Sequence, residues 1–431
     1  MKKLLISFIF LFINFFYNPV FAESKNKQTY ELLDLFGQIF DRVRDSYVEE
    51  VTDEELIEKA IDGMLTGLDP HSGYMDEDVW DEMQMDTQGK FGGLGIEITM
   101  EEGFVKVISP IEDTPAYRAG VKAGDYIIQI DETPVYGLTL TEAVELMRGE
   151  RGAPITITIS REGLEPFEIE IVRDFIKLQS VKEDIFNQVG YLRITSFTEQ
   201  TEKGLKKSIK SINQKLKDNE LGYILDLRSN PGGLLTQAVK VTDIFLNQGE
   251  IVSTRGRNKN DMKRYRAKYG DLIKNKPLVV IINGGSASAS EIVAGALQDH
   301  KRAIVIGTKS FGKGSVQTII PFKKSNDKMA GIRLTTARYY TPSGESIQGK
   351  GIEPDIIVEQ GSFEASDFKR ISESDLRGSL DKNEDADKNV KDEENENVLT
   401  PQEERLAIDF QLARAVDLIV GLSIYKESNL N

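Results

Sequence analysis

The sequence predicts an α/β protein in which helices lead into a mostly β domain, an α/β core follows, and a further helix ends the chain. Three patterns support this fold class: apolar residues at helical spacing from 28 to 67, short β-type runs from 89 to 173, and strands alternating with helices from about 175 to 358. A chain of 431 residues with 39% hydrophobic residues can form two or three domains with real cores.

The composition excludes several kinds of chemistry. The chain has 54 Lys and Arg against 70 Asp and Glu, a formal charge of −16, two His and no Cys. Without Cys there is no disulfide, no thiolate nucleophile and no cysteine-ligated zinc, and two His are too few for a histidine-rich metal site. We therefore expect no metal and no other cofactor. The acidic balance also argues against nucleic acid as a partner, because phosphate binding needs clustered Lys and Arg.

The first 22 residues are typical of a signal peptide. An apolar run from 4 to 16 follows two lysines, and Val20 and Ala22 supply the small residues expected before a cleavage site. The run is shorter than the roughly 20 residues needed to span a bilayer, which favours cleavage after Ala22 over an uncleaved anchor. The mature chain is then expected to start at Glu23 and to be periplasmic.

Residues 23–88 are expected to form an N-terminal helical segment. The apolar spacing from 28 to 67 predicts two amphipathic helices. The sequence Asp-Pro-His-Ser-Gly at 69–73 breaks this pattern, and an acidic, Met-rich stretch leads to a glycine cluster near 89. A new domain is expected to start there.

Residues 89–173 combine short strands with two short helices, and they resemble a PDZ domain over their whole length. The resemblance rests on GGLGIEI at 92–98 and TPAYRAGVKAGDYIIQID at 114–131. The glycines allow backbone amides to turn inward as a carboxylate nest, and the next strand offers an edge to an added peptide strand. We expect a peptide carboxyl terminus to bind at Gly93, Leu94, Gly95 and Ile96. A glycine-rich hairpin without a ligand is the alternative.

The segment 174–360 is predicted to contain the α/β core. Apolar runs that suit buried strands are separated by helical stretches, and they lie at 190–194, 222–227, 278–282 and 303–306. Residues 364–396 contain 12 acidic and 6 basic side chains, so 361–400 is expected to be an acidic flexible linker. An amphipathic pattern from about 402 to 424 predicts one C-terminal helix within 401–431.

Ser288 is the first candidate for chemistry. It lies in NGGSASASE at 283–291, between a predicted strand and an apolar helical pattern. Ser288 and Glu291 match the S-x-x-E capping box, so backbone amides and the helix dipole would face an anion formed beside the serine hydroxyl. An isolated S-x-x-E is far more often only a helix cap, so the rest of the sequence must decide.

Lys313 is the second candidate. GTKSFGKGSVQ at 307–317 nearly matches a phosphate-binding loop, but Gly314 stands where the magnesium-binding Ser or Thr belongs, and we expect no nucleotide. If the segment is instead a loop that enters a strand, Lys313 and Gln317 lie on one face of an extended chain. A buried lysine with a lowered pKa can accept the proton of a serine.

Four motifs, taken in order, resemble those of the C-terminal processing peptidases, also called tail-specific proteases. They are LDLRSNPGG at 225–233, NGGSASASEIVAGALQD at 283–299, GTKSFGKGSVQ at 307–317 and TPSGESIQGKGIEPD at 341–355. The similarity covers nearly all of 28–358, including the place of the PDZ-like segment before the core. It implies an ATP-independent serine endopeptidase with a Ser-Lys pair, whose α/β protease core is related to the crotonase and Clp protease folds.

The resemblance also implies residue roles. Ser288 would be the nucleophile, Lys313 the general base, and Gln317 the residue that orients Lys313. The PDZ-like domain would bind unstructured, apolar C-terminal tails of protein substrates, such as envelope proteins, and deliver the preceding chain to Ser288.

Two backbone amides would form the oxyanion hole: that of Ala289 and that of Gly232, with Gly233 as the alternative to Gly232. The resemblance further implies gating by movement of the PDZ domain. A homo-oligomer and an adaptor protein are further partners to consider, and the exposed apolar faces of the terminal helices would suit dimer contacts or packing on their own core.

Two rival functions stay open at this point. A secreted PDZ scaffold would bind carboxyl termini without any chemistry. A histidine-dependent, trypsin-like protease would need His71, which is in a turn, or His300, which is at a predicted helix end, as its base, and the chain has no GNSGG-type serine loop.

Overall fold

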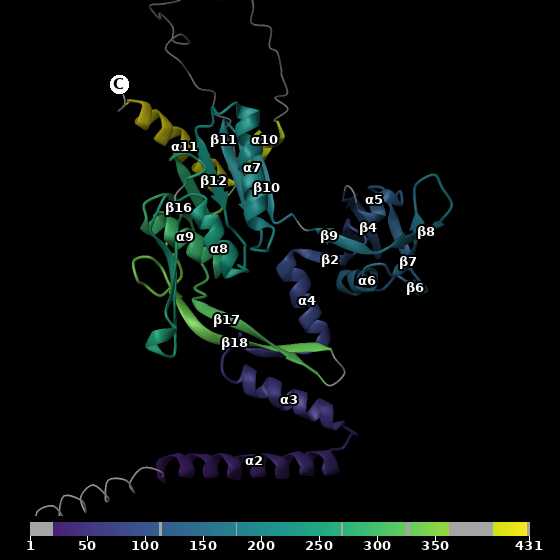
Figure 1. Ribbon diagram of the computed structural model, residues 1–431. Helices are drawn as coiled ribbons and strands as arrows, with labels where there is room; N and C mark the ends of the chain where they lie inside the picture. Colours follow the sequence, from purple (N-terminus) through teal and green to yellow (C-terminus); the bar gives the residue numbers. More distant parts are fainter. Residues whose placement is uncertain are drawn as a thin grey trace, which may run out of the picture. The chain divides into compact units, whose positions relative to one another are not determined.

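The computed structural model describes residues 20–111, 114–177, 179–268, 270–324, 328–361 and 400–428 (Figure 1). The apolar run of the expected signal peptide and nearly all of the expected acidic linker lie outside these residues. Within the described ranges, no helix combines the length and apolar character needed to cross a membrane. The chain divides into two compact units, Met1–Asp76 with Gln317–Thr335 and Glu77–Val316 with Thr336–Asn431.

The first unit contains two helices and part of a β-hairpin. The helices α2 (Val20–Ser46) and α3 (Asp53–Thr66) lie where the apolar spacing predicted them. β1 (Gly73–Met75) pairs antiparallel with β18 (Met329–Tyr340), and β17 (Ser315–Lys323) pairs with the same strand. Several large apolar side chains of α2 are exposed to solvent: Leu32, Leu33, Leu35, Phe36 and Ile39.

In the second unit, the PDZ-like segment forms a sheet around a core of its own. Its strands are β3 (Ile96–Glu101), β4 (Phe104–Pro110), β5 (Tyr126–Ile130), β6 (Thr133–Pro134), β7 (Pro154–Ser160) and β8 (Phe167–Val172), and its helices are α5 (Pro115–Arg118) and α6 (Leu140–Met147). The sheet order is β3-β4-β5-β7-β8, with β6 on β5, so β3 is an edge strand. Alternate residues of β7 are buried, as expected for a sheet with one face on a core.

The chain enters and leaves this domain along a two-stranded ribbon. β2 (Lys90–Gly93) pairs antiparallel with β9 (Asp174–Lys177), and the two strands flank the PDZ-like segment in the sequence. A helix, α4 (Glu77–Gln88), precedes the ribbon. The ribbon therefore marks the PDZ-like segment as an insertion into the rest of the second unit (Figure 1).

The core of the second unit is a six-stranded sheet that lies between helices. The sheet order is β10 (Val181–Phe186), β11 (Val189–Ile194), β12 (Gly222–Asp226), β15 (Leu278–Ile282), β16 (Ile304–Gly307) and β19 (Ile356–Ile357). All neighbours are parallel except β10 and β11. Every residue of β12 and β15 is buried, which explains why these strands read as unbroken apolar runs.

Helices cover both faces of this sheet. The helices α7 (Thr201–Leu216), α8 (Leu235–Asp243) and α9 (Ala289–Asp299) share one apolar cluster with it. The C-terminal helix α11 (Phe410–Ser428) shares a second cluster with the opposite face. A smaller sheet contains β13 (Glu250–Gly256), which pairs with β14 (Lys263–Arg266) and with the end of β18.

The prediction of one C-terminal helix was wrong, because the chain forms two. α10 (Pro401–Ile408) ends at Asp409, whose backbone leaves the helical region with φ −114° and ψ 83°. The Asp409 carboxylate accepts the N–H of Leu412 at 3.1 Å and so caps α11. It also pairs with Arg228 of the core, a contact that the amphipathic pattern could not reveal.

Candidate active site

Ser288 lies in a sharp turn between β15 and α9. Its backbone has φ 54° and ψ −111°, a region that residues other than glycine rarely adopt. The flanking serines, Ser286 and Ser290, are fully buried, and their hydroxyls donate to the carbonyl oxygens of Leu227 and Asn230. Of the three serines only Ser288 is partly exposed. The turn therefore presents the one serine that the resemblance assigned as nucleophile.

The buried carboxylate of Glu291 connects this turn to the loop that contains Lys313. Its Oε2 accepts the backbone N–H of Ser288 at 2.7 Å and that of Lys313 at 2.9 Å. Its Oε1 accepts the Ser310 hydroxyl and the N–H of Gly312, both at 2.6 Å. Because one oxygen atom holds both amides, the backbones of Ser288 and Lys313 lie close together.

The same carboxylate argues against a phosphate-binding loop at 307–317. In such a loop the backbone amides face phosphate oxygens. Here the amides of Gly312 and Lys313 donate to Glu291 instead. The loop is therefore folded onto an acidic side chain, which is not compatible with a nucleotide phosphate at the same amides.

The turn at 230–233 packs directly on the serine. The Asn230 carbonyl accepts the N–H of Ala287 at 3.0 Å. A Cβ at Gly232, where φ is +108°, would lie 2.8 Å from the Ser288 Cβ and 3.0 Å from the Ala289 nitrogen, so this close approach requires glycine. Ala289 is the first residue of α9, and its N–H has no acceptor within the helix.

The structure adds a complication to the predicted oxyanion hole. The N–H of Gly232 donates to Asn230 Oδ1 at 2.9 Å, so that amide would have to exchange its acceptor to bind an oxyanion. The choice between Gly232 and Gly233 stays a prediction.

Gln317 lies in β17, in the first unit. Its Nε2 donates to Thr335 Oγ1 at 3.2 Å, and the Thr335 hydroxyl donates to the Asp69 carboxylate at 3.1 Å. These contacts fix one side of the Gln317 amide. The predicted role of Gln317 in orienting Lys313 stays a prediction.

The histidine at the end of α9 does not lie near Ser288. His300 is at the C-terminal end of the helix, whereas Ser288 is at its N-terminal end. Its Nε2 lies 2.7 Å from the carbonyl oxygen of Glu250. This placement disfavours His300 as the base of a histidine-dependent protease.

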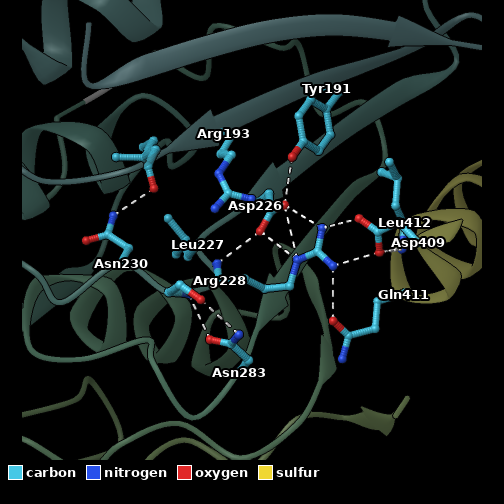
Figure 2. Close-up of polar contacts among 12 residues, drawn as sticks. Tyr191, Arg193, Asp226, Leu227, Arg228, Asn230, Asn283, Asp409, Gln411 and Leu412 are labelled. Atoms are coloured by element: carbon cyan, nitrogen blue, oxygen red, sulfur yellow. Dashed lines mark hydrogen bonds and ion pairs between the residues drawn. The ribbon is translucent and has the colours of Figure 1, made fainter. Parts of the chain in front are cut away.

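A buried network of charges is centred on Asp226 and Arg228, which precede the turn at 230–233 in the sequence, and the sequence analysis missed it (Figure 2). Asp226, with no exposed surface, accepts the Tyr191 hydroxyl at 2.7 Å and pairs with the Arg228 guanidinium at 2.7 Å. The guanidinium also binds both carboxylate oxygens of Asp409 at 2.7 Å and Gln411 at 3.1 Å. The C-terminal helices thereby contact the segment that leads into the turn.

The ionisation of this network follows from its contacts. Burial alone would lower the pKa of Arg228, but its bonds with Asp409 and Asp226 raise that pKa above its ordinary value. Burial would raise the pKa of Asp409, but the bonds with Arg228 bring it below its ordinary value. Arg228 and Asp409 therefore form a charged pair at neutral pH.

The four predicted peptide-binding residues run from the end of the β2–β9 ribbon to the start of the PDZ-like sheet: Gly93 ends β2 and pairs with Asp174, and Ile96 begins β3. The Leu94 side chain is buried in the core of the domain, so it could offer a peptide only its backbone. The Gly95 carbonyl accepts the N–H of Ile111 at 2.8 Å and the Thr114 hydroxyl at 3.0 Å. In the described part of the chain β3, which begins at Ile96, pairs only with β4. One edge of β3 is thus available for an added strand.

This fold and this site define a serine peptidase that contains a PDZ domain, and comparisons with known proteins identify the family. Residues 188–358 match peptidase family S41, residues 106–161 match the PDZ domain, and residues 18–79 match the N-terminal domain of the activating protease CtpB. The chain belongs to the carboxy-terminal-processing proteases of peptidase family S41. The predicted family and α/β fold class are confirmed, and the chain is a C-terminal processing serine protease.

Two curated relatives show the extent of the similarity. The carboxy-terminal-processing protease of Bartonella bacilliformis is 56% identical over 370 residues, which cover 85% of this chain and 84% of that protein. The carboxy-terminal processing protease CtpA of Bacillus subtilis is 35% identical, over 76% of this chain and 69% of that protein. Among solved structures, the photosystem II D1 C-terminal processing protease is 28% identical, with a TM-score of 0.45 over 74% of this chain and 85% of that one.

Proposed function

We propose that this protease is an exported, ATP-independent endopeptidase in which Ser288 and Lys313 form the catalytic pair. It cleaves proteins near unstructured C-terminal tails that its PDZ domain binds. The observation that supports the pair most directly is that Glu291 Oε2 accepts the backbone amides of both residues.

The chemistry begins with neutral Lys313, which removes the proton from Ser288 Oγ as this oxygen attacks the scissile carbonyl carbon. The carbonyl oxygen becomes an oxyanion beside the N-terminus of α9, where the Ala289 amide and the helix dipole stabilise negative charge. Lys313 then gives its proton to the leaving amine, and an acyl-enzyme on Ser288 remains. Water attacks the acyl carbon as Lys313 takes one of its protons, and Lys313 returns that proton to Ser288 Oγ as the bond from Oγ to the acyl carbon breaks and the carboxylate product leaves.

Substrate selection is assigned to the PDZ domain. Its strand β3 has an unpaired edge in the described structure, which a peptide strand can extend through main-chain hydrogen bonds. The glycine-rich start of the domain, with Gly95 at φ +79°, offers backbone amides to a terminal carboxylate. Substrates with apolar tails and a free C-terminal carboxylate fit this arrangement.

Export and self-association complete the proposal. Export is supported by the lysines and the apolar run at the N-terminus, with cleavage after Ala22. Cell fractionation with N-terminal sequencing tests it: a periplasmic protein that starts at Glu23 is expected, whereas a cytoplasmic protein that keeps Met1 contradicts it.

Binding of a second copy of the chain as a dimer partner is supported by the exposed apolar side chains of α2. Sedimentation equilibrium of the chain that starts at Glu23 tests this: a dimer is expected, and a monomer at micromolar concentration contradicts it.

The activity is tested with one unfolded reporter protein that has either an apolar C-terminal tail or the same tail ending in two aspartates. The parent chain is expected to cleave the first reporter much faster, and Ser288→Ala is expected to cleave neither while it still binds the apolar tail. Equal cleavage of both reporters would contradict tail recognition. Binding without cleavage by the parent chain would contradict the proposed tail-directed cleavage.

A further inference from the structure

A phenol group lies buried beside the active-site serine, and the mechanism above does not use it. Tyr339 belongs to β18 and is 2% exposed. Within the described part of the chain its hydroxyl has no hydrogen-bond partner. Buried polar groups almost always have such partners, so an unpaired one needs an explanation.

The position of Tyr339 connects it to both members of the proposed catalytic pair. Its backbone N–H donates at 3.0 Å to the carbonyl of Gly314, the residue that follows Lys313. The Glu291 carboxylate and the Ser288 hydroxyl are the two side chains that act on the ionisation of its hydroxyl. Ser288, Glu291, Gly314 and Tyr339 all belong to the second unit.

The phenol keeps its proton throughout the neutral pH range. Burial raises the pKa of Tyr339 well above its ordinary value, the negative charge of Glu291 raises it further, and the Ser288 hydroxyl opposes them only in part. Tyr339 is therefore a hydrogen-bond donor at this site and not a base.

We propose, on the basis of the function proposed above, that Tyr339 is a third catalytic group that donates its phenolic hydrogen bond to Ser288 Oγ during the reaction. When Oγ gives its proton to Lys313 and forms the bond to the carbonyl carbon, negative charge develops on Oγ. The phenol stabilises that charge and keeps its own proton. It acts again when the acyl-enzyme breaks down and Oγ leaves the carbonyl carbon.

This role accounts for a buried hydroxyl that has no hydrogen-bond partner among the described residues. A donor aimed at charge that appears only in the transition state accelerates the reaction more than one already engaged in the ground state. This arrangement lowers the stability of the resting enzyme, because a buried hydroxyl is left without a hydrogen bond. A purely structural tyrosine would instead have its hydroxyl paired, as Tyr191 does with Asp226.

The test compares Tyr339→Phe with the parent chain in cleavage of the apolar-tailed reporter. Loss of one donor to a developing oxyanion typically costs about 10²-fold in kcat. We expect kcat of Tyr339→Phe to fall about 10²-fold, KM to stay within about twofold, and Tm to stay equal or rise, because an unpaired polar group is removed. The matched control is Tyr340→Phe, whose half-buried ring stacks on Arg255 and which should keep the parent kcat. A kcat of Tyr339→Phe within twofold of the parent would overturn the proposal.

A second variant distinguishes a catalytic role of the Tyr339 hydroxyl from a structural one. It also tests the proposal if Tyr339→Phe does not fold. Incorporation of 3,5-difluorotyrosine at position 339 keeps the hydroxyl but lowers its pKa. We expect this variant to retain activity at neutral pH and to lose it at a lower alkaline pH than the parent. If the activity of this variant falls at the same alkaline pH as that of the parent, the proposal is contradicted. Ser288→Ala, assayed in parallel, tests the proposed function independently: if it is inactive, failure of the Tyr339 predictions concerns Tyr339 alone.

Discussion

Replacing Glu291 by alanine is expected to separate the serine turn from the loop of Lys313. The carboxylate accepts three backbone amides, those of Ser288, Gly312 and Lys313, at a site with no exposed surface. Alanine leaves all three without an acceptor. An unpaired buried donor costs about 1–3 kcal/mol, so the three together cost roughly 3–9 kcal/mol, and water that enters the space brings the loss toward the lower value.

Glutamine at this position provides a graded comparison. Its single carbonyl oxygen can keep the amides of Ser288 and Lys313, while its NH₂ group faces Ser310 and Gly312. The Ser310 hydroxyl can rotate to accept from that group, but the Gly312 N–H cannot. One unpaired donor predicts a loss of about 1–3 kcal/mol in the free energy of unfolding.

Urea unfolding followed by circular dichroism, together with reporter cleavage, measures both effects. Glu359→Gln, on an exposed residue outside the site, serves as the matched control and should behave as the parent. Since a displacement of about 1 Å in a catalytic group can cost 10²-fold, kcat should fall by about that factor in Glu291→Ala and less in Glu291→Gln. The reasoning is refuted if Glu291→Ala unfolds within 1 kcal/mol of the parent and keeps its kcat.

Three further outcomes follow from the contacts described. Asp409→Asn weakens the pair with Arg228 and should lower the free energy of unfolding by about 1–3 kcal/mol. Because folding lowers the pKa of Asp409, its contribution is present above the ordinary carboxyl pKa of about 3.9 and is lost as pH falls through the folded value, so Tm scans between pH 7 and pH 3 should converge for parent and variant. Gly232→Ala should abolish cleavage, whereas Gly344→Ala, also at a positive φ but in open space, should lower stability only; equal kcat values would contradict the close approach to the serine. Gly95→Ala places a Cβ 2.3 Å from the Cβ of Thr114 and so disturbs the loop proposed to bind the tail. KM should rise for reporters with an apolar tail and change little for a peptide without one. An unchanged KM for the tailed reporters would rule out this loop as the tail site.

Much of the site could be predicted because its chemistry is concentrated in short local motifs. The S-x-x-E pattern located the start of α9 at Ser288, and the structure has that helix and the bond from the Ser288 N–H to Glu291. The buried strands could be recognised as apolar runs, since both faces of the core sheet are covered by helices. Helix starts and buried strands can be predicted from a single sequence, because both depend on residues that are close together along the chain.

The missing parts all depend on contacts between distant segments. The bonds from Glu291 to Gly312 and Lys313 cross from a helix to another loop, and no spacing within either motif shows them. Tyr339 is one buried residue in the alternating pattern of a strand, and that pattern does not reveal its backbone bond to Gly314, the residue after Lys313. The helix break falls at Asp409, which pairs with Arg228 of the core, whereas the apolar spacing in the sequence continues through α10 and α11.

The central claim is that Ser288 and Lys313 act as one catalytic pair, and the most direct measurement is kcat for Ser288→Ala, Lys313→Ala and the double variant on the apolar-tailed reporter. All three chains should be shown to fold as the parent does. Groups that act as a unit give non-additive losses, so each single variant should lose at least about 10³-fold and the double variant should lose no more than either. Cleavage by Ser288→Ala at a rate close to that of the parent would contradict the claim, as would a Lys313→Ala variant with parental kcat.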